Sequence, residues 1–207
     1  MELPKLVVYG AGDNGREFAY RYKHEGLNRE CEFVGFVDDH SGEGFLGYPV
    51  LGNSKDLPRL REGGVENIIV FLLEKPQTRL KICIELEKMG FKFPSSKSPY
   101  NNTGVNIGKG VYIHPTATFL GIGGQDIGDF SVIGPYVTVE GGVKTGKGVI
   151  LSPYVCVHKG VSIGDGSVFY SRAICFPRVK VGKNCIVAPH GIVRKYLRDN
   201  GKIKSPR

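Results

Sequence analysis

A glycine-rich motif near the start of the chain has the spacing of a phosphate-binding loop. It reads Gly10-Ala11-Gly12-Asp13-Asn14-Gly15. The first glycine permits a tight turn, the second lets the backbone approach a phosphate, and the N-terminus of a following helix supplies partial positive charge. Two carboxylates about 20 residues further on could accept hydrogen bonds from a ribose or sugar hydroxyl. We therefore expect a nucleotide-linked substrate to contact Gly10, Gly12, Asn14, Gly15, Asp38 and Asp39.

The segments around this motif predict alternating strands and helices, the context in which such a motif binds nucleotides. The expected strands are 5–9, 32–37 and 67–72, and the expected helices are 16–24 and 78–89. In the second helix, inward-facing positions are expected at Leu80, Cys83, Ile84 and Leu86, and Gly90 ends the helix. We expect a Rossmann-like domain over residues 1–97 and a linker around 94–99. This length is short for a dinucleotide fold, which favours a mononucleotide or nucleotide-sugar over NAD.

A six-residue repeat dominates the rest of the chain. Every sixth residue from Ile127 to Val193 is aliphatic, aromatic or small, and never charged, and a glycine often follows it. This period fits neither an α-helix nor an ordinary meander. It predicts a left-handed parallel β-helix over residues 104–207, in which three short strands make a coil and the glycine allows a tight corner. About five coils of about 18 residues fit between positions 105 and 197, with two extra residues within 121–126.

The composition excludes several classes of protein. Of 207 residues, 41% are hydrophobic and 23% charged, and no apolar run approaches the roughly 20 residues of a membrane span. The first residues contain no signal-peptide core, so we expect a cytoplasmic protein without membrane insertion. Five widely spaced cysteines are expected to be reduced and mostly buried. The net charge of +8 is concentrated in a basic C-terminal tail, which is either a solvated end or a contact for cofactor phosphates.

The two halves together resemble the bacterial hexapeptide-repeat acyltransferases that include the sialic acid O-acetyltransferases and the bacillosamine-pathway UDP-amino-sugar N-acetyltransferases. The repeat array carries the resemblance, along with the segments Val8-Tyr9-Gly10-Ala11-Gly12, Gly35-Phe36-Val37-Asp38-Asp39, Gly47-Tyr48-Pro49-Val50-Leu51-Gly52 and Ile113-His114-Pro115-Thr116-Ala117. The resemblance implies that the N-terminal domain holds a nucleotide-sugar and that the β-helix holds acetyl-CoA, or another acyl-CoA, as donor. It also implies a homotrimer with sites shared between subunits, and it implies no metal. A basic solenoid that binds nucleic acid is a weaker alternative, because the sequence has no aromatic residues interleaved on a basic face.

In this family a histidine acts as general base on the acceptor amine or hydroxyl, often with a carboxylate beside it. The position that corresponds to this histidine holds Gly141, and the nearest histidine of the array is His158, one coil further on. Three hypotheses follow. His158 acts as base with Glu140 as its orienting carboxylate, since adjacent coils are about 4.8 Å apart; or Glu140 itself is the base; or proton abstraction has been lost.

The resemblance also suggests which residues contact CoA. The expected contacts are the backbone at Lys159, Gly160 and Ala188, with Arg194 and Lys195 meeting the phosphates. Among the other histidines, His114 is expected to be structural and His190 to lie at the surface, while His24 and His40 lack a nearby catalytic constellation.

The sequence thus predicts an acyltransferase that moves an acyl group from acyl-CoA to an amine or hydroxyl of a nucleotide-activated sugar. The alternative is a catalytically silent homologue that binds nucleotide-sugar or CoA and acts as a regulatory or scaffold protein. Gly141 is the residue that motivates this alternative.

Overall fold

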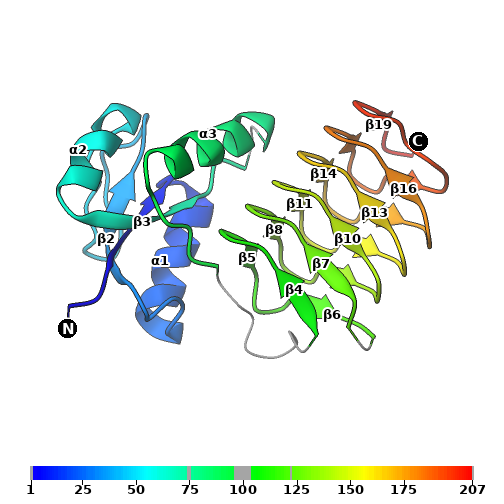
Figure 1. The fold of residues 1–207 in the computed structure, drawn as a ribbon, viewed down its shortest axis with the longest axis horizontal. Helices are drawn as coiled ribbons and strands as arrows, with labels where there is room; N and C mark the ends of the chain where they lie inside the picture. Colours follow the sequence, from blue (N-terminus) through cyan, green and yellow to red (C-terminus); the bar gives the residue numbers. More distant parts are fainter. Residues whose placement is uncertain (1, 74–75, 96–103, 122, 207) are drawn as a thin grey trace. The chain divides into compact units, whose positions relative to one another are not determined.

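A computed structural model describes residues 2–73, 76–95, 104–121 and 123–206 (Figure 1). The chain divides into two compact units, Met1–Lys75 with Lys81–Pro94, and Pro76–Leu80 with Ser95–Arg207. The predicted linker lies mostly outside the described residues, as does the boundary expected between positions 97 and 104.

The N-terminal unit contains a small parallel sheet with the strand order β2-β1-β3. Its strands are β1 (Lys5–Tyr9), β2 (Glu32–Val37) and β3 (Val65–Val70), and its helical segments are α1 (Asp13–Glu25), η1 (Ser54–Asp56) and α2 (Leu57–Glu62). The helix α3 (Pro76–Lys88) belongs to this unit from Lys81 onward, and its first residues, Pro76–Leu80, belong to the second unit. The first two strands were predicted with these bounds, whereas the third begins and ends two residues earlier than expected. The aliphatic run of β1 is almost fully buried, as a strand with neighbours on both sides requires.

Two expectations for this unit were wrong. Ile84 was expected to face inward, but 37% of its surface is exposed. The segment η1–α2 was not predicted, because a helix of six residues is too short to show hydrophobic periodicity. Its start could have been found from a capping box, in which Asn53 and Asp56 bond each other's backbone N–H groups.

The second unit is a parallel β-solenoid of about five turns that matches a left-handed β-helix, as the six-residue period predicted. Short strands stack into three parallel sheets, visible as three sides of the coil in Figure 1. One side consists of β4 (Val105–Ile107), β7 (Gln125–Ile127), β10 (Lys144–Thr145), β13 (Ser162–Ile163) and β16 (Lys180–Val181). The second consists of β5 (Tyr112–Ile113), β8 (Val132–Ile133), β11 (Ile150–Leu151), β14 (Val168–Phe169), β17 (Ile186–Val187) and β19 (Lys202–Ile203). The third consists of β6 (Thr118–Phe119), β9 (Thr138–Val139), β12 (Cys156–Val157), β15 (Ile174–Cys175) and β18 (Ile192–Val193).

The register between coils follows the spacing in the sequence. Cys156 pairs with Thr138 on one side and with Ile174 on the other, a step of one regular coil each time. Thr118, by contrast, pairs with Thr138. That longer step confirms the two extra residues predicted within 121–126, and it shows that they are accommodated within one coil without a change in the pairing of the later strands.

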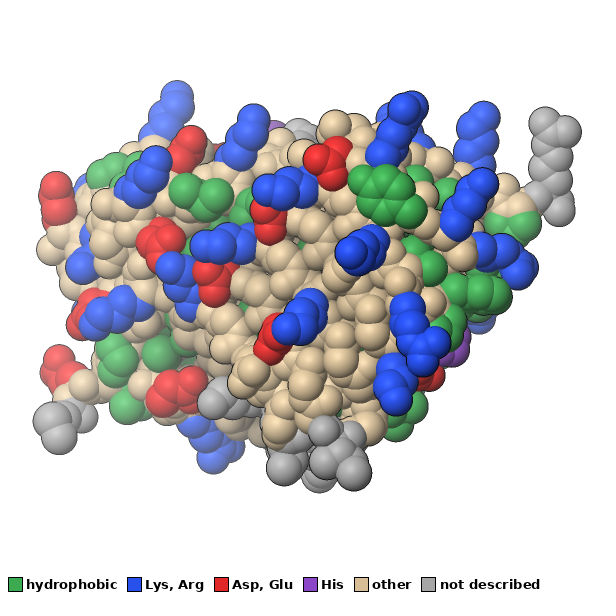
Figure 2. All heavy atoms as spheres, turned by 45° about the vertical axis from the view of Figure 1, so that its right-hand side comes forward, with side chains coloured by type: hydrophobic (Ala, Val, Ile, Leu, Met, Phe, Trp, Pro, Cys, Tyr) green, Lys and Arg blue, Asp and Glu red, His purple; other side chains and the backbone are tan. Residues whose placement is uncertain are grey.

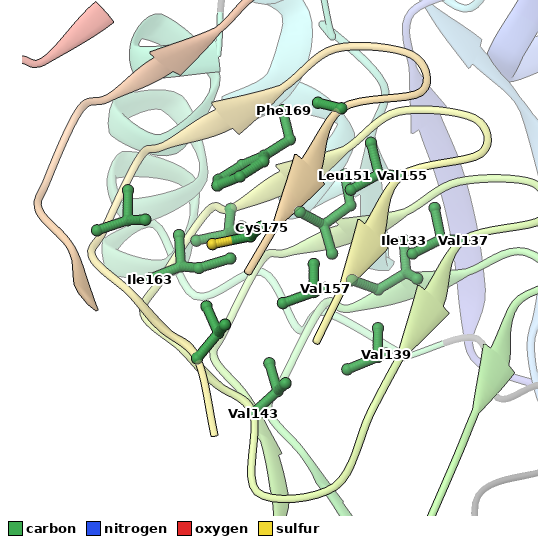
Figure 3. Close-up of a cluster of buried hydrophobic side chains, with 14 of the residues drawn as sticks. Ile133, Val137, Val139, Val143, Leu151, Val155, Val157, Ile163, Phe169 and Cys175 are labelled. Atoms are coloured by element: carbon green, nitrogen blue, oxygen red, sulfur yellow. The ribbon is translucent and has the colours of Figure 1, made fainter. Parts of the chain in front are cut away.

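The residues at every sixth position form one row of the solenoid core, and the residues two positions before them form a second row; Figure 3 labels side chains of both, with Val137, Val143 and Val155 from the second. Each member of the first row is at most 8% exposed, and the full row is Ile127, Ile133, Val139, Thr145, Leu151, Val157, Ile163, Phe169, Cys175, Val181, Val187 and Val193. Burying one such aliphatic side chain contributes about 1.5–3 kcal/mol. The repeat therefore accounts for most of the apolar burial that stabilises this unit.

The corners of the solenoid differ from the prediction. The left-handed backbone position lies three residues after the core residue rather than one, and it is often not glycine, as at Tyr136, Tyr154 and Asn184. The glycine directly after the core residue has another reason. A Cβ built on Gly164 would lie 2.6 Å from the Gly182 carbonyl carbon in the next coil. This glycine permits close stacking of coils, not a turn.

This distinction can be tested with two glycine substitutions. Gly164→Ala is expected to lower the free energy of unfolding by about 1–3 kcal/mol, because the added Cβ must push two backbones apart. Gly142→Asn is the matched control: its backbone is left-handed (φ +72°), its Cβ would meet nothing closer than 3.8 Å, and Asn tolerates that conformation. Urea unfolding followed by circular dichroism measures both. Equal losses in the two variants would contradict the stacking explanation.

The basic C-terminal segment is built into the fold and is not a free tail. Its strand β19 extends the side of the solenoid that contains β17. The Asp199 carboxylate accepts a 2.8 Å hydrogen bond from the Lys183 N–H, as Asp165 does from Lys147 two coils earlier at 2.9 Å. The basic residues at this end of the chain thus lie partly on a strand of the solenoid. Figure 2 shows Lys and Arg side chains over much of the face that it draws, with Asp and Glu among them.

All five cysteines are free, four of them buried and Cys156 partly exposed, which confirms the prediction of reduced, mostly buried thiols. In the described part of the chain, no helix has the length and apolar character needed to cross a membrane.

Candidate functional site

Two neighbouring coils bring His158 and Glu140 into contact. Each residue directly follows a strand of the third sheet, β12 and β9, and those strands pair in register. Because the preceding valines point into the core, the alternation along a strand turns both polar side chains outward. The Nδ1 atom of His158 lies 2.9 Å from Oε1 of Glu140. The side chains are 33% and 30% exposed, so a ligand can reach them.

The Glu140 carboxylate determines which nitrogen of the imidazole is protonated. The hydrogen bond with His158 is the main cause that lowers the pKa of Glu140, and a 2.8 Å hydrogen bond donated by the Lys159 N–H to Oε2 lowers it further. An ionised carboxylate only accepts hydrogen bonds, so Nδ1 must donate. In the neutral imidazole Nε2 then carries a lone pair, and this nitrogen is available to take a proton.

Two further residues belong to the same outward column. The ring of Phe176 lies 6.4 Å from that of His158 in an edge-to-face arrangement, and the Arg194 guanidinium lies 4.8 Å from the Phe176 centroid. The column therefore runs Glu140, His158, Phe176, Arg194. Phe176 was not predicted as a site residue, although it lies one coil of 18 residues from both His158 and Arg194.

A thiol was also missed. Cys156 lies two residues before His158, on the same outward side of β12, and its Sγ is 3.7 Å from Nε2. The alternation of side chains along a strand could have indicated this pairing, since residues i and i+2 share a face.

The residues expected to contact CoA are brought together only in part. Lys159, Gly160, Arg194 and Lys195 lie on one corner of the solenoid, where the chain leaves the third sheet, and all four are exposed. The first pair is two coils from the second, about 10 Å along the stack. Ala188 lies elsewhere, at the corner that follows β17, where its N–H bonds to Ile203.

The glycines of the N-terminal motif differ in what the fold demands of them. Gly10 adopts φ +114°, which supports the expected tight turn. A Cβ on Gly15 would collide with the carbonyl of Gly10, so this glycine lets α1 pack closely against the loop. Gly12 has ordinary extended backbone and open space around it, so nothing in the chain itself requires a glycine there. Asn14 is exposed on the first turn of α1.

Both aspartates after β2 already bind the chain's own backbone. Asp38 Oδ2 accepts a 2.7 Å hydrogen bond from the Ala11 N–H, and Oδ1 accepts two of 2.8 Å from His40 and Ser41. Asp39 accepts from the Tyr9 hydroxyl at 2.6 Å and from the Ser54 N–H at 2.8 Å. A sugar hydroxyl bound by either carboxylate would share it with these donors, which the sequence did not indicate.

These contacts predict a pH-dependent contribution of Asp38 to stability. Burial by itself would raise the pKa of Asp38, but the three backbone donors outweigh it and lower the pKa. The contribution is therefore present above the unfolded pKa of about 3.9 and is lost as the pH falls through the lower folded value. Asp38→Asn is expected to lower the free energy of unfolding by about 1–2 kcal/mol at neutral pH. The difference in free energy of unfolding between the variant and the wild type should become smaller in acid. Denaturant unfolding across pH measures it, with exposed Asp13→Asn as the control; a difference that is constant with pH would contradict the assignment.

The remaining histidines have different surroundings. His114 is buried, with Nδ1 2.8 Å from the Thr116 hydroxyl, a contact that suits a structural role. His190 is exposed at a left-handed corner position, and His24 and His40 are exposed in the N-terminal unit. Among the described residues, no group of three or more His, Cys, Asp or Glu side chains could hold a metal ion.

Comparison with solved structures gives full-length matches. No protein-family model and no curated protein matches the sequence. The chain is similar to a mutant GDP-perosamine N-acetyltransferase from Caulobacter crescentus in complex with CoA and GDP-perosamine, at 25% identity and a TM-score of 0.85, over 98% of this chain and 97% of that one. A further structure of this Caulobacter protein, PerB, with the same two ligands matches at 25% identity and 0.84, over 97% of each chain.

The predicted resemblance to the hexapeptide-repeat acetyltransferases is confirmed. The acetyltransferase domain of PglB from Neisseria gonorrhoeae, in complex with acetyl coenzyme A, has a TM-score of 0.85 over 99% of this chain and 100% of that one. At 23% identity this last likeness shows the fold alone.

Proposed function

We propose that this protein transfers an acetyl group from acetyl-CoA to an amine of a nucleotide-activated sugar. The observation that carries the proposal is the full-length similarity to an N-acetyltransferase that binds CoA and GDP-perosamine. The exposed dyad of His158 and Glu140 supplies the base that such a transfer needs, although the family's usual histidine position holds Gly141.

In this reaction His158 Nε2 accepts a proton as the amine attacks the thioester carbonyl, while Glu140 holds the imidazole in the correct tautomer. General base catalysis of this kind typically contributes 10²–10⁴-fold. Glu140 is poorly suited to be the base itself, because its lowered pKa makes it a weaker proton acceptor. Of the two hypotheses in which a side chain acts as base, the one with His158 as base and Glu140 as its orienting carboxylate is therefore better supported.

The exposed cations near the dyad suit the phosphates of CoA. Lys159 and Gly160 follow His158 directly, and Arg194 and Lys195 lie on the same corner two coils away. Charge-assisted hydrogen bonds from these side chains would hold the nucleotide end of the cofactor. Ala188 lies on another corner, so it would contact the same CoA only if the ligand spans two corners or if a neighbouring subunit contributes it.

We assign nucleotide-sugar binding to the N-terminal unit, over about residues 1–97, as a reduced Rossmann-like domain beside a β-helix domain over 104–207. The three parallel strands, the tight turn at Gly10 and the open approach at Gly12 support a nucleotide phosphate at the start of α1. A homotrimer with sites shared between subunits is part of the same proposal, as is a cytoplasmic location, where acetyl-CoA and nucleotide-sugars occur together.

The direct test is an acetyl-transfer assay. The protein is incubated with acetyl-CoA and a panel of GDP-, UDP- and dTDP-linked amino sugars. Release of the CoA thiol is followed over time, and the masses of the products are measured by mass spectrometry. The matching hydroxy sugars serve as the control that separates N- from O-transfer. Thiol release only with amino sugars supports the proposal. Calorimetric binding of a nucleotide-sugar without any turnover would instead support the silent homologue.

A further inference from the structure

The positive charge of the chain is concentrated at one end of the solenoid. Residues 1–165 contain 18 Lys or Arg and 19 Asp or Glu, so this part is close to neutral. Residues 166–206, the last coils in Figure 1 and here called the basic end, contain nine Lys or Arg and one acidic residue, Asp199. All nine cationic side chains are exposed: Arg172, Arg178, Lys180, Lys183, Arg194, Lys195, Arg198, Lys202 and Lys204. The basic end therefore accounts for the net charge of +8.

These cations are less well neutralised than those of earlier coils. Lys147, for example, forms an ion pair of 3.0 Å with Asp129 of the preceding coil. At the basic end Lys183 pairs with Asp165 at 3.2 Å, whereas the other eight cations form no ion pair with the residues that the structure describes. Repulsion among like charges lowers the stability of a compact fold. The fold itself therefore gives no reason for this excess of positive charge.

The cations surround the basic end and do not follow a single groove. Lys180 lies on β16, at the first side of the solenoid, and Lys202 lies on β19, at the second. Arg172 and Arg178 lie at left-handed corner positions after β14 and β15, which belong to the second and third sides. The CoA contacts proposed above occupy one corner, so a single CoA molecule leaves the cations of the other sides without an anionic partner.

The exposed rings at the basic end do not have the arrangement that binds a nucleic acid strand. Such a strand requires a row of aromatic side chains on which successive bases stack beside the cations. In residues 166–206, the large exposed rings are those of Tyr170 and Tyr196, which are 37% and 67% exposed. They follow strands of different sheets, β14 and β18, so they do not form such a row. Positive charge on all sides of a blunt end suits a flat anionic surface instead.

We propose that the basic end binds the surface of an anionic phospholipid bilayer. The long stems of Lys and Arg let their charged groups reach past the last coil toward the headgroups. Each such cation near an anionic bilayer increases the affinity about fivefold, and the attraction decreases with salt. The exposed ring of Tyr196 suits the headgroup level, where tyrosine is common in membrane proteins. The contact is peripheral, and it does not depend on the proposed transferase activity.

The first experiment measures co-sedimentation of the full-length protein with vesicles. Vesicles of phosphatidylcholine with phosphatidylglycerol should bind the protein, vesicles of phosphatidylcholine alone should not, and added sodium chloride should release the protein. Replacing chloride by inorganic phosphate at the same ionic strength should release no more, because the bilayer engages many cations at once. Release by a low concentration of phosphate would show a site for a single anion and would overturn the proposal, as would equal binding to both kinds of vesicle.

The second experiment locates the contact with two triple variants of equal charge. Arg198→Gln/Lys202→Gln/Lys204→Gln removes three exposed cations from the basic end and should weaken binding to the anionic vesicles about 100-fold. The control, Lys55→Gln/Lys81→Gln/Lys88→Gln, removes three exposed cations from the other unit and should bind as the wild type does.

The thermal unfolding midpoint of both triple variants shows that each one folds. Arg178→Gln/Lys180→Gln tests the preceding coil separately and should weaken vesicle binding about 25-fold. Equal weakening by the control would show that only the total charge matters and would overturn the assignment to the basic end. Binding of an oligonucleotide without binding of anionic vesicles would overturn the bilayer in favour of nucleic acid. Binding of neither would leave the basic end as a solvated surface and would overturn the proposal.

Discussion

His158→Gln is expected to lower kcat for acetyl transfer by about 10²–10⁴-fold, with little change in binding of either substrate. The glutamine side chain is similar in length and polarity, so the coil can keep its shape, but it has no nitrogen that takes up a proton near neutral pH. Because Nε2 serves the attack on the thioester, the loss should appear in kcat. Steady-state kinetics with acetyl-CoA and the best amino sugar, together with calorimetry for binding, measure both quantities.

Glu140→Gln distinguishes the alternatives for the base. If Glu140 orients the imidazole, the amide can still accept a hydrogen bond from Nδ1, and the loss should be smaller than for His158→Gln. If Glu140 were the base, its replacement would abolish transfer and His158→Gln would leave most of it. The second pattern would contradict the role assigned to His158. Lys183→Ala, on another corner and paired with Asp165, provides a control with wild-type kinetics.

The regular part of the fold could be predicted because one physical constraint repeats. A three-sided coil buries side chains two residues apart on each side, so the pattern of burial recurs every six residues and can be recognised in the sequence. The insertion at 121–126 could be predicted for the same reason, because it interrupts the six-residue period. The left-handed corner positions could not be predicted from the sequence, because residues as unlike as Phe130, Tyr154 and Arg172 adopt that backbone conformation. The glycines that follow the core residues are required by close contact with the backbone of the next coil, about 18 residues away in the chain.

The candidate site was predictable where it follows the coil and unpredictable elsewhere. The contact between Glu140 and His158 follows from their spacing of one coil. Asp38 and Asp39 were expected to meet a sugar, but irregular loops fold back onto them through Ala11 and Ser54. Such loops have no period, so their hydrogen bonds cannot be read from residue spacing. Burial, together with the hydrogen bond to Asp39, raises the pKa of Tyr9 to about 12, and no sequence pattern indicates this shift.

Phe169→Ala is expected to cost about 3–5 kcal/mol of unfolding free energy. Phe169 is fully buried, and its strand β14 lies between β11 and β17, so coils on both sides pack against the ring. Removing the ring leaves a cavity that rigidly stacked backbones cannot close. Lys180→Ala, exposed on the next coil, should change stability by less than about 0.5 kcal/mol.

The position of this loss along the chain can be measured as well. In a solenoid each coil contacts only its neighbours, so a cavity should weaken protection most in the coils around β14 and less toward β4. The chain contains no tryptophan, so urea unfolding is followed by circular dichroism, and hydrogen exchange with peptide resolution locates the weakened coils. A loss no larger than that of Lys180→Ala would show that the row of every sixth residue does not form the core. Protection lost evenly over residues 104–206 would show instead that the coils unfold as one cooperative unit.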